Sequence, residues 1–120
     1  MPDRLKGRTL LVVEDEFLIL LDLQYLLENE GASVVTATTV AEGLEAAAGD
    51  YAAAVLDVRL PDGEVFPVAE RLAARNVPLV FHSGHARIEE IEEQFPDAVM
   101  LSKPAPERTL IETLSTRAST

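Results

Sequence analysis

The stretch Thr9-Leu10-Leu11-Val12-Val13-Glu14-Asp15-Glu16 combines two features that decide the fold. Residues 9–13 are almost entirely apolar, which is typical of a strand buried on both faces, and three carboxylates follow directly. Residues 16–29 then show helical spacing of apolar side chains, and Gly31 follows them. Glycine is a residue type that commonly ends a helix. A buried strand with acids at its carboxyl end and a helix after it predicts one unit of a parallel α/β sheet.

The same unit recurs along the whole chain, without an intervening repeat, linker or low-complexity segment. The predicted strands are residues 9–13, 33–36, 53–56, 79–81 and 98–101. The predicted helices are residues 16–29, 40–48, 64–75, 87–94 and 107–117. Thr39 and Glu42 have the spacing of a capping box. Five such pairs predict an α/β fold with a doubly wound, five-stranded parallel sheet and helices on both faces.

Length and composition exclude several classes of function. The 120 residues suit a single domain, residues 1–120, and the excess of 21 Asp and Glu over 10 Lys and Arg gives a net charge of −11. Such a chain repels polyphosphate backbones and anionic lipid headgroups, so we expect no direct binding to nucleic acid or to a membrane. The chain has no cysteine, no long apolar stretch and no signal-like start, which favours a cytoplasmic protein.

Polar residues follow four of the predicted strands, namely Glu14 and Asp15, Asp57, Ser83, and Lys103. Doubly wound sheets bind ligands outside the carboxyl ends of their strands, so these side chains are expected to converge. Crowded carboxylates repel one another unless a cation or protons intervene, and sites made only of oxygen ligands select hard ions such as Mg²⁺. The set therefore indicates phosphoryl transfer to an aspartate, assisted by a metal, a lysine and a hydroxyl group.

These residues resemble those of response-regulator receiver domains, and the resemblance extends from Leu10 to about Leu114. It rests on residues 11–16, 55–63, 83–84 and 101–104. It implies a flavodoxin-like receiver topology with strand order 2-1-3-4-5 and a role in phosphorelay signalling rather than as a classical enzyme. The implied phosphodonor is a sensor histidine kinase or a histidine phosphotransfer protein. Output would then follow through a downstream protein target or by draining phosphoryl groups as a phosphate sink.

The resemblance also implies a role for individual residues. Asp57 would accept the phosphoryl group, Lys103 would pair with its oxygens, and Ser83 would follow the phosphate in the active conformation. The implied magnesium ligands are Asp57 and Asp15 directly, Glu14 through water, and the main-chain carbonyl of Arg59. Residues 78–85 are also similar to a strand of stand-alone receivers that are common in alphaproteobacteria.

Three further residues are expected to tune this chemistry. Arg59 and His85 lie two residues beyond Asp57 and Ser83, where their bulk and charge would alter the lifetime of the phosphoryl group. Met100 occupies the position where receivers usually carry a Tyr or Phe switch, which leaves the coupling of phosphate to the fourth and fifth strands open. A zinc site at His82 and His85 is disfavoured because the sequence offers no cysteine and no obvious third ligand.

Three alternative functions are weaker on the same residues. A pseudo-receiver that only binds partners is disfavoured because the acids, Ser83 and Lys103 are all present. A haloacid-dehalogenase-like phosphatase needs a second Asp two residues after its nucleophile, where this chain has Arg59. In a flavodoxin-like FMN site, the acids of residues 14–16 would repel the FMN phosphate.

The predicted first helix, residues 16–29, has more apolar positions than one core-facing stripe requires. It is either wedged between its neighbours or offers a surface for kinase docking or homodimerisation, so we expect a monomer or a weak homodimer. No DNA-binding output domain is expected, because residues 115–120 are too few to form one, although the sequence leaves a longer parent protein open.

Overall fold

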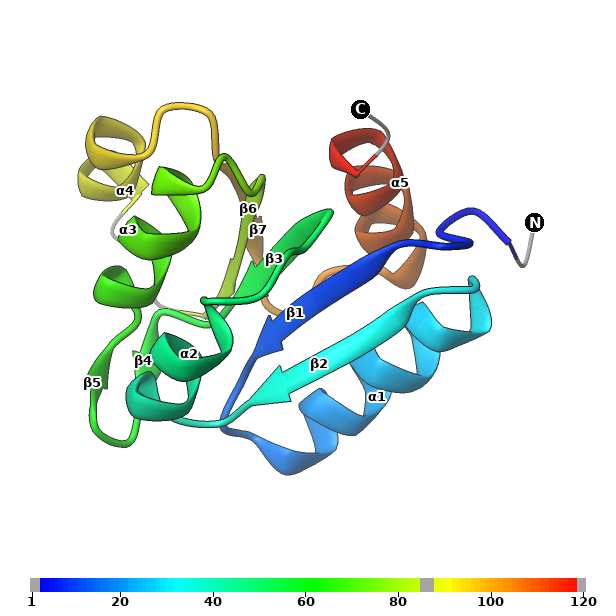
Figure 1. Ribbon diagram of the computed structural model, residues 1–120, viewed down its shortest axis with the longest axis horizontal. Coiled ribbons are helices and arrows are strands. Elements are labelled where there is room, and N and C mark those ends of the chain that lie inside the picture. The colour runs from blue at the N-terminus through cyan, green and yellow to red at the C-terminus, as the bar shows by residue number, and fades with distance from the viewer. Residues whose placement is uncertain (1–2, 85–87, 119–120) are drawn as a thin grey trace.

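A parallel sheet forms the centre of the molecule. In the computed structural model, which describes residues 3–84 and 88–118, five parallel strands form one sheet. They are β1 (Thr9–Val13), β2 (Ser33–Ala37), β3 (Ala53–Leu56), β6 (Leu79–Ser83) and β7 (Val99–Ser102). Their order is β2-β1-β3-β6-β7 (Figure 1), which confirms the predicted α/β fold and its strand order.

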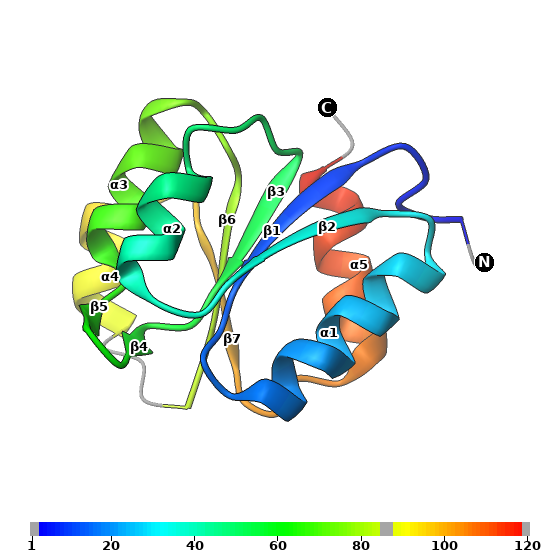
Figure 2. The ribbon, with the colours of Figure 1, turned by 60° about the horizontal axis from the view of Figure 1, so that its bottom comes forward.

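Helices cover both faces of this sheet, as right-handed crossovers between parallel strands require. Figure 2 shows α1 (Phe17–Asn29) and α5 (Glu107–Arg117) on one face, and α2 (Val40–Ala46), α3 (Phe66–Ala74) and α4 (Ile88–Gln94) on the other. Side chains alternate along β1 between the two cores: Leu11 and Val13 join the core under α2, α3 and α4, and Leu10 and Val12 join the core under α1 and α5. This two-sided burial explains why the strands read as continuous apolar runs.

The predicted elements are confirmed, with shifts at their ends. The strand predicted at 79–81 continues to Ser83, and the one predicted at 98–101 spans Val99–Ser102. The prediction of a helix over 64–75 was wrong at its start, because Gly63–Glu64 forms strand β5, which pairs antiparallel with β4 (Arg59–Leu60). The helix predicted at 40–48 ends at Ala46, and α4 is short, with seven residues.

The hairpin of β4 and β5 is tied to the start of α2. The first backbone N–H groups of a helix lack partners within the helix, and here the carboxylate of Asp62 accepts hydrogen bonds from two of them. Its oxygens lie 2.7 Å from the nitrogen of Val40 and 3.1 Å from that of Ala41. The bond from Val40 is the largest influence on Asp62 and lowers the pKa of its carboxyl group. The loop after Asp57 is thereby fixed against a second element.

Thr39 caps α2 as predicted, since its Oγ1 accepts a hydrogen bond from the nitrogen of Glu42 at 3.0 Å. The reciprocal half of the capping box is displaced by one residue. The carboxylate of Glu42 accepts from the nitrogen of Thr38 at 2.7 Å and from its hydroxyl at 2.9 Å. Because these bonds favour the charged form, they lower the pKa of Glu42.

Gly43 allows α2 to pack closely against α3. A Cβ atom at this position would lie 2.9 Å from Cγ2 of Val68, which is fully buried in α3. Alanine normally stabilises a helix by about 1 kcal/mol relative to glycine, but at position 43 its methyl group would meet Val68.

We expect Gly43→Ala to lower the free energy of unfolding, because overpacking a buried contact costs about 1–3 kcal/mol and outweighs the gain in propensity. The double variant Gly43→Ala/Val68→Ala should be more stable than the sum of the single effects, because the added methyl group occupies the space that the valine leaves. Urea unfolding of the four proteins measures this coupling. A stabilising effect of Gly43→Ala alone would contradict the packing argument.

Candidate functional site

The residues predicted to form a site follow strands that lie side by side. Backbone hydrogen bonds extend the sheet past the strand ends: the nitrogen of Glu14 donates to the carbonyl oxygen of Ala37 at 3.0 Å, and that of Asp57 donates to Val13 at 2.9 Å. The nitrogen of Lys103 donates in the same way to the carbonyl oxygen of Ser83 at 3.2 Å. The sheet therefore fixes the backbone positions from which these side chains extend.

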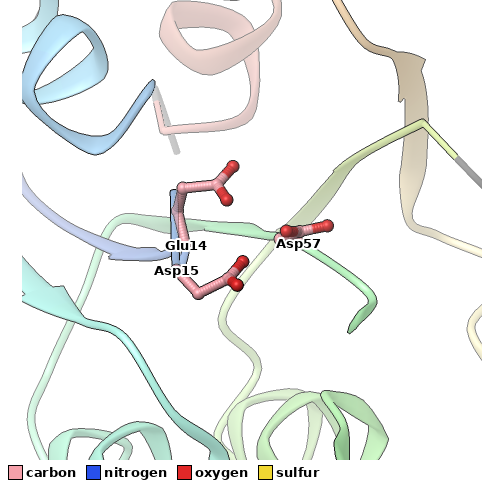
Figure 3. A group of neighbouring side chains, drawn as sticks. All are labelled: Glu14, Asp15 and Asp57. Atoms are coloured by element: carbon pink, nitrogen blue, oxygen red, sulfur yellow. The ribbon is translucent and has the colours of Figure 1, made fainter. Parts of the chain in front are cut away.

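Glu14, Asp15 and Asp57 form a cluster of carboxylates. Among the described residues, each offers one oxygen atom such that all of these atoms lie within 4.8 Å of one another. Figure 3 shows the side chains of Glu14 and Asp15, at the end of β1, beside that of Asp57, at the end of β3. Glu14 and Asp57 are buried, whereas Asp15 is exposed. Such a set of hard oxygen ligands, open on one side, fits a divalent cation of the Mg²⁺ type.

The ammonium group of Lys103 lies between two of these carboxylates. Its Nζ is 2.7 Å from Oε1 of Glu14 and 3.2 Å from Oδ2 of Asp57, and the carboxylate of Glu16 lies further away at 3.8 Å. Burial acts to lower the pKa of Lys103, but the hydrogen bonds and charges of Glu14 and Asp57 outweigh it and raise the pKa above its ordinary value. Lys103 is therefore a cation held over the phosphoacceptor candidate.

The pKa of Glu14 reflects the crowding of charge in the cluster. Burial raises it to about 7, and Asp57 adds to the rise. Hydrogen bonds from Lys103 and from the backbone nitrogen of Glu16, the latter at 3.1 Å, oppose the shift without cancelling it. The single positive charge of Lys103 therefore does not neutralise the carboxylates of the cluster. The negative charge that remains favours binding of a further cation.

The remaining predicted site residues lie on β6, β4 and β7 or outside the described residues. Ser83 is buried at the end of β6, the strand that pairs with β3. Arg59 begins β4 and is exposed. Met100 is half-buried, pairs in register with Phe81 and packs against the core under α2, α3 and α4. His85 lies outside the described residues.

Sequence reasoning missed one feature of the site's surroundings. The sequence suggests a role for His82 only in a disfavoured zinc pair, yet the structure buries its side chain at the end of β6. Burial lowers the pKa of its imidazole, and the nearby charge of Lys103 lowers it further against the opposing effect of Asp57. The apolar character of residues 79–81 predicted burial of this strand, but no pattern indicated that a histidine would continue it.

Comparison with known proteins identifies the family. The model of the response regulator receiver domain matches residues 10–115. The chain belongs to this family. Receiver domains accept phosphoryl groups from histidine kinases in two-component signalling, and they are not classical enzymes. The strand order and the acidic cluster described above agree with this membership.

Individual relatives agree in fold over most of this receiver. A response regulator receiver protein from Sinorhizobium medicae WSM419 is 28% identical, with a TM-score of 0.86 over 97% of this chain and 98% of that one. The receiver domain of the sensor histidine kinase PA1611 from Pseudomonas aeruginosa PAO1 is 21% identical, with a TM-score of 0.80 over 95% and 99% of the two chains. In that structure a magnesium ion is coordinated in the active-site cleft.

A further relative is a much longer protein. The transcriptional regulatory protein TcrA from Mycobacterium tuberculosis H37Rv is 44% identical over 78 residues, which are 62% of this chain and 30% of that protein. The receiver thus spans less than a third of the curated relative that it matches. None of the helices in the described part of the receiver has the length and apolar character to cross a membrane.

We expect Mg²⁺ to raise the melting temperature of this receiver, because a ligand that binds only the folded state adds about 2.7 kcal/mol of stability at 100 times its Kd. Asp15→Asn should lose most of this gain, because it removes one of the three carboxylates of the cluster. Asp15 is exposed, so the substitution leaves the core intact. Glu70→Gln, which removes an exposed acid on α3, is the matched control and should keep the full gain. Equal Mg²⁺ shifts in all three proteins, measured by thermal unfolding, would contradict a site at this cluster.

Proposed function

We propose that this receiver accepts a phosphoryl group on Asp57 in a phosphorelay, in a step that depends on Mg²⁺. The observation that carries this proposal is the position of Lys103, whose Nζ lies 3.2 Å from the Asp57 carboxylate and 2.7 Å from that of Glu14. A lysine in this place keeps a positive charge where the oxygens of a phosphoryl group would arrive. An aspartate without such a partner would meet the incoming anion with repulsion alone.

The proposed chemistry follows from the site residues. An oxygen of the Asp57 carboxylate attacks phosphorus in a phosphohistidine. As the new O–P bond forms, the N–P bond of the donor breaks, and its electron pair returns to the imidazole nitrogen. Lys103 contacts the transferred oxygens, and Ser83 donates its hydroxyl to another of them. Glu14, Asp15, Asp57 and the carbonyl of Arg59 would hold Mg²⁺, which supplies charge neutralisation at the phosphoryl group.

We expect incubation with acetyl phosphate and Mg²⁺ to add one phosphoryl group to the receiver, measured as intact-protein mass. Asp57→Asn should abolish the adduct, because an amide is not a nucleophile toward phosphorus. Lys103→Ala should reduce its formation by tenfold or more, since removal of a positioned charge from a transition state costs about 2–4 kcal/mol. Asp97→Asn, at an exposed turn outside the site, is the matched control.

The absence of an adduct with acetyl phosphate is followed by a test with a second donor. If Mg²⁺ raises the melting temperature but acetyl phosphate leaves no adduct, a phosphohistidine donor is tested next. If neither donor labels Asp57, the receiver functions as a pseudo-receiver that only binds partners, and the proposal is overturned. Labelling at another residue in the Asp57→Asn variant would overturn the assignment of the acceptor.

We propose further that the phosphodonor, a histidine kinase or a histidine phosphotransfer protein, docks on α1. Four large apolar side chains of this helix are exposed: Phe17, Leu18, Leu21 and Tyr25, of which Leu18 is 75% exposed. They are therefore not wedged between neighbouring elements of the described chain. Because α1 begins directly after the acidic residues, a helical partner on this surface would bring its phosphohistidine to Asp57.

We expect Leu18→Glu to slow transfer from the phosphohistidine donor that labels the native receiver fastest, while leaving labelling by acetyl phosphate unchanged. A charge at an apolar contact weakens docking, but it does not touch the reacting groups. Val35→Glu, at an exposed apolar residue of the edge strand β2, is the control and should preserve both rates. Equal rates from the protein donor in the native receiver and Leu18→Glu would contradict docking on α1.

The remaining expectations stay predictions. They are a cytoplasmic location, a single domain over residues 1–120, a monomer or weak homodimer, and output through a downstream protein or as a phosphate sink. Control of phosphoryl lifetime by Arg59 and His85, and a switch at Met100, stay predictions as well. The exposure of Arg59, two residues beyond Asp57, supports its proposed role in controlling the lifetime of the phosphoryl group.

A further inference from the structure

Glu16 is the outermost of three carboxylates around the ammonium group of Lys103. Its Oε1 lies 3.8 Å from Nζ, which is an ion-pair distance but too long for a hydrogen bond. Its side chain is 64% exposed, whereas those of Glu14 and Asp57 are 2% and 10% exposed. Glu16 is therefore the member of this group that solvent reaches, and its attraction to Lys103 is purely electrostatic.

The backbone fixes Glu16 at this position. Glu16 is the N-cap of α1, and its carbonyl oxygen accepts a hydrogen bond from the nitrogen of Leu20 at 2.9 Å. Its own nitrogen donates to Oε2 of Glu14 at 3.1 Å. An N-cap side chain commonly accepts a hydrogen bond from the first turn of its helix, but the side chain of Glu16 makes no such bond. Its carboxylate is therefore available to Lys103.

Glu16 and Lys103 also line the same cavity. This cavity has a volume of about 480 Å³ and lies between α1 and α5, the two helices that share one face of the sheet (Figure 2). Its wall is mainly apolar and includes Ile19 and Leu26 of α1. Apolar walls of low dielectric constant focus the field of a nearby charge. The charge of Glu16 therefore acts more strongly at this site than the charge of an acid on an open surface would.

We propose that Glu16 competes with the phosphoryl group for Lys103 and thereby slows phosphorylation of Asp57, most of all by donors with a larger negative charge. This inference rests on the proposed function, since it concerns the rate of that reaction. The ammonium group of Lys103 is shared by the carboxylates of Glu14, Asp57 and Glu16. A phosphoryl group that arrives at Asp57 needs the same ammonium group. Glu16 both retains Lys103 and repels the incoming anion, so it is a positioning residue that acts through Lys103.

Two small donors that differ in charge test this selectivity. At neutral pH acetyl phosphate is a dianion and phosphoramidate carries a single negative charge, and the initial rate of labelling by each is measured at one Mg²⁺ concentration. We expect Glu16→Gln to speed labelling by acetyl phosphate about two- to fivefold and labelling by phosphoramidate less, so that the ratio of the two rates rises. Salt at about 0.5 M should reduce this difference, because the screening length then falls below about 8 Å.

Two further variants separate the charge of Glu16 from other effects. Glu16→Asp restores the charge and should return both rates most of the way to their native values. Glu28→Gln, at the other end of α1, is the matched control. It removes the same charge from the same helix at roughly 18 Å from Glu16, given a rise of 1.5 Å per residue, and should leave both rates unchanged.

Binding of beryllium trifluoride is a second measurement, and it needs no group transfer because this anion mimics a phosphoryl group on an aspartate. ¹⁹F NMR in the presence of Mg²⁺ gives its affinity for each protein. Glu16→Gln should tighten this binding about two- to fivefold, since Lys103 is released to the fluorides. Thermal unfolding of the same proteins measures the interaction of Glu16 with the helix dipole, which is the purely structural role of an acid at this position.

An unchanged ratio of rates together with an unchanged affinity for beryllium trifluoride in Glu16→Gln would overturn the proposal, whatever the melting temperature. Slower labelling of Glu16→Gln would overturn it as well, because the carboxylate would then assist the reaction. If no donor labels the native receiver but beryllium trifluoride binds it, the proposed transfer fails, and the affinities still decide whether Glu16 competes for Lys103. If the native receiver is neither labelled nor bound by beryllium trifluoride, both proposals are overturned.

Discussion

A sheet that is covered by helices on both faces accommodates charged side chains where its strands end, and this constraint governs the whole receiver. The side chains of Leu10 to Val13 are all fully buried, and they alternate between the two cores. Polarity begins at Glu14, one residue later. The same change from apolar to polar occurs between Leu56 and Asp57. Parallel strands bring these changes to one edge of the sheet, so the acidic cluster follows from the architecture.

Concentration of charge at that edge has an electrostatic cost, and Lys103 offsets part of it. Burial raises the pKa of Glu14 to about 7, whereas the hydrogen bonds and charges of Glu14 and Asp57 raise the pKa of Lys103. Burial thus disfavours the charged forms, and the ion pairs favour them. A site balanced in this way responds to added charge. A divalent cation would relieve repulsion among the acids, and in the proposed reaction a phosphoryl group on Asp57 would compete with Glu14 for the same ammonium group. Under the proposed function, cation binding and phosphorylation would be coupled through Lys103.

The elements that could be predicted from sequence are those with strong periodicity. Five buried strands and the helices between them have distinct patterns, and the acids, Ser83 and Lys103 stand at strand ends that the pattern itself locates. The hairpin of β4 and β5 could not be found in this way, because strands of two residues have no period. Asp62 joins this hairpin to α2 by accepting hydrogen bonds from Val40 and Ala41, residues 22 and 21 positions away. Contacts of this kind are tertiary and leave no local signal.

Helix α1 illustrates how a surplus of apolar residues is used. A helix that covers one face of a sheet needs a single apolar stripe, which Leu20, Leu23 and Leu27 supply here. A second group, formed by Phe17, Leu18, Leu21 and Tyr25, faces solvent, while Ile19 and Leu26 line the cavity beside α5. The two groups lie on different sides of one helix, so a large partner protein on the first need not cover the second. Because α1 begins directly after the acidic residues that follow β1, a protein on the first group would lie close to Asp57.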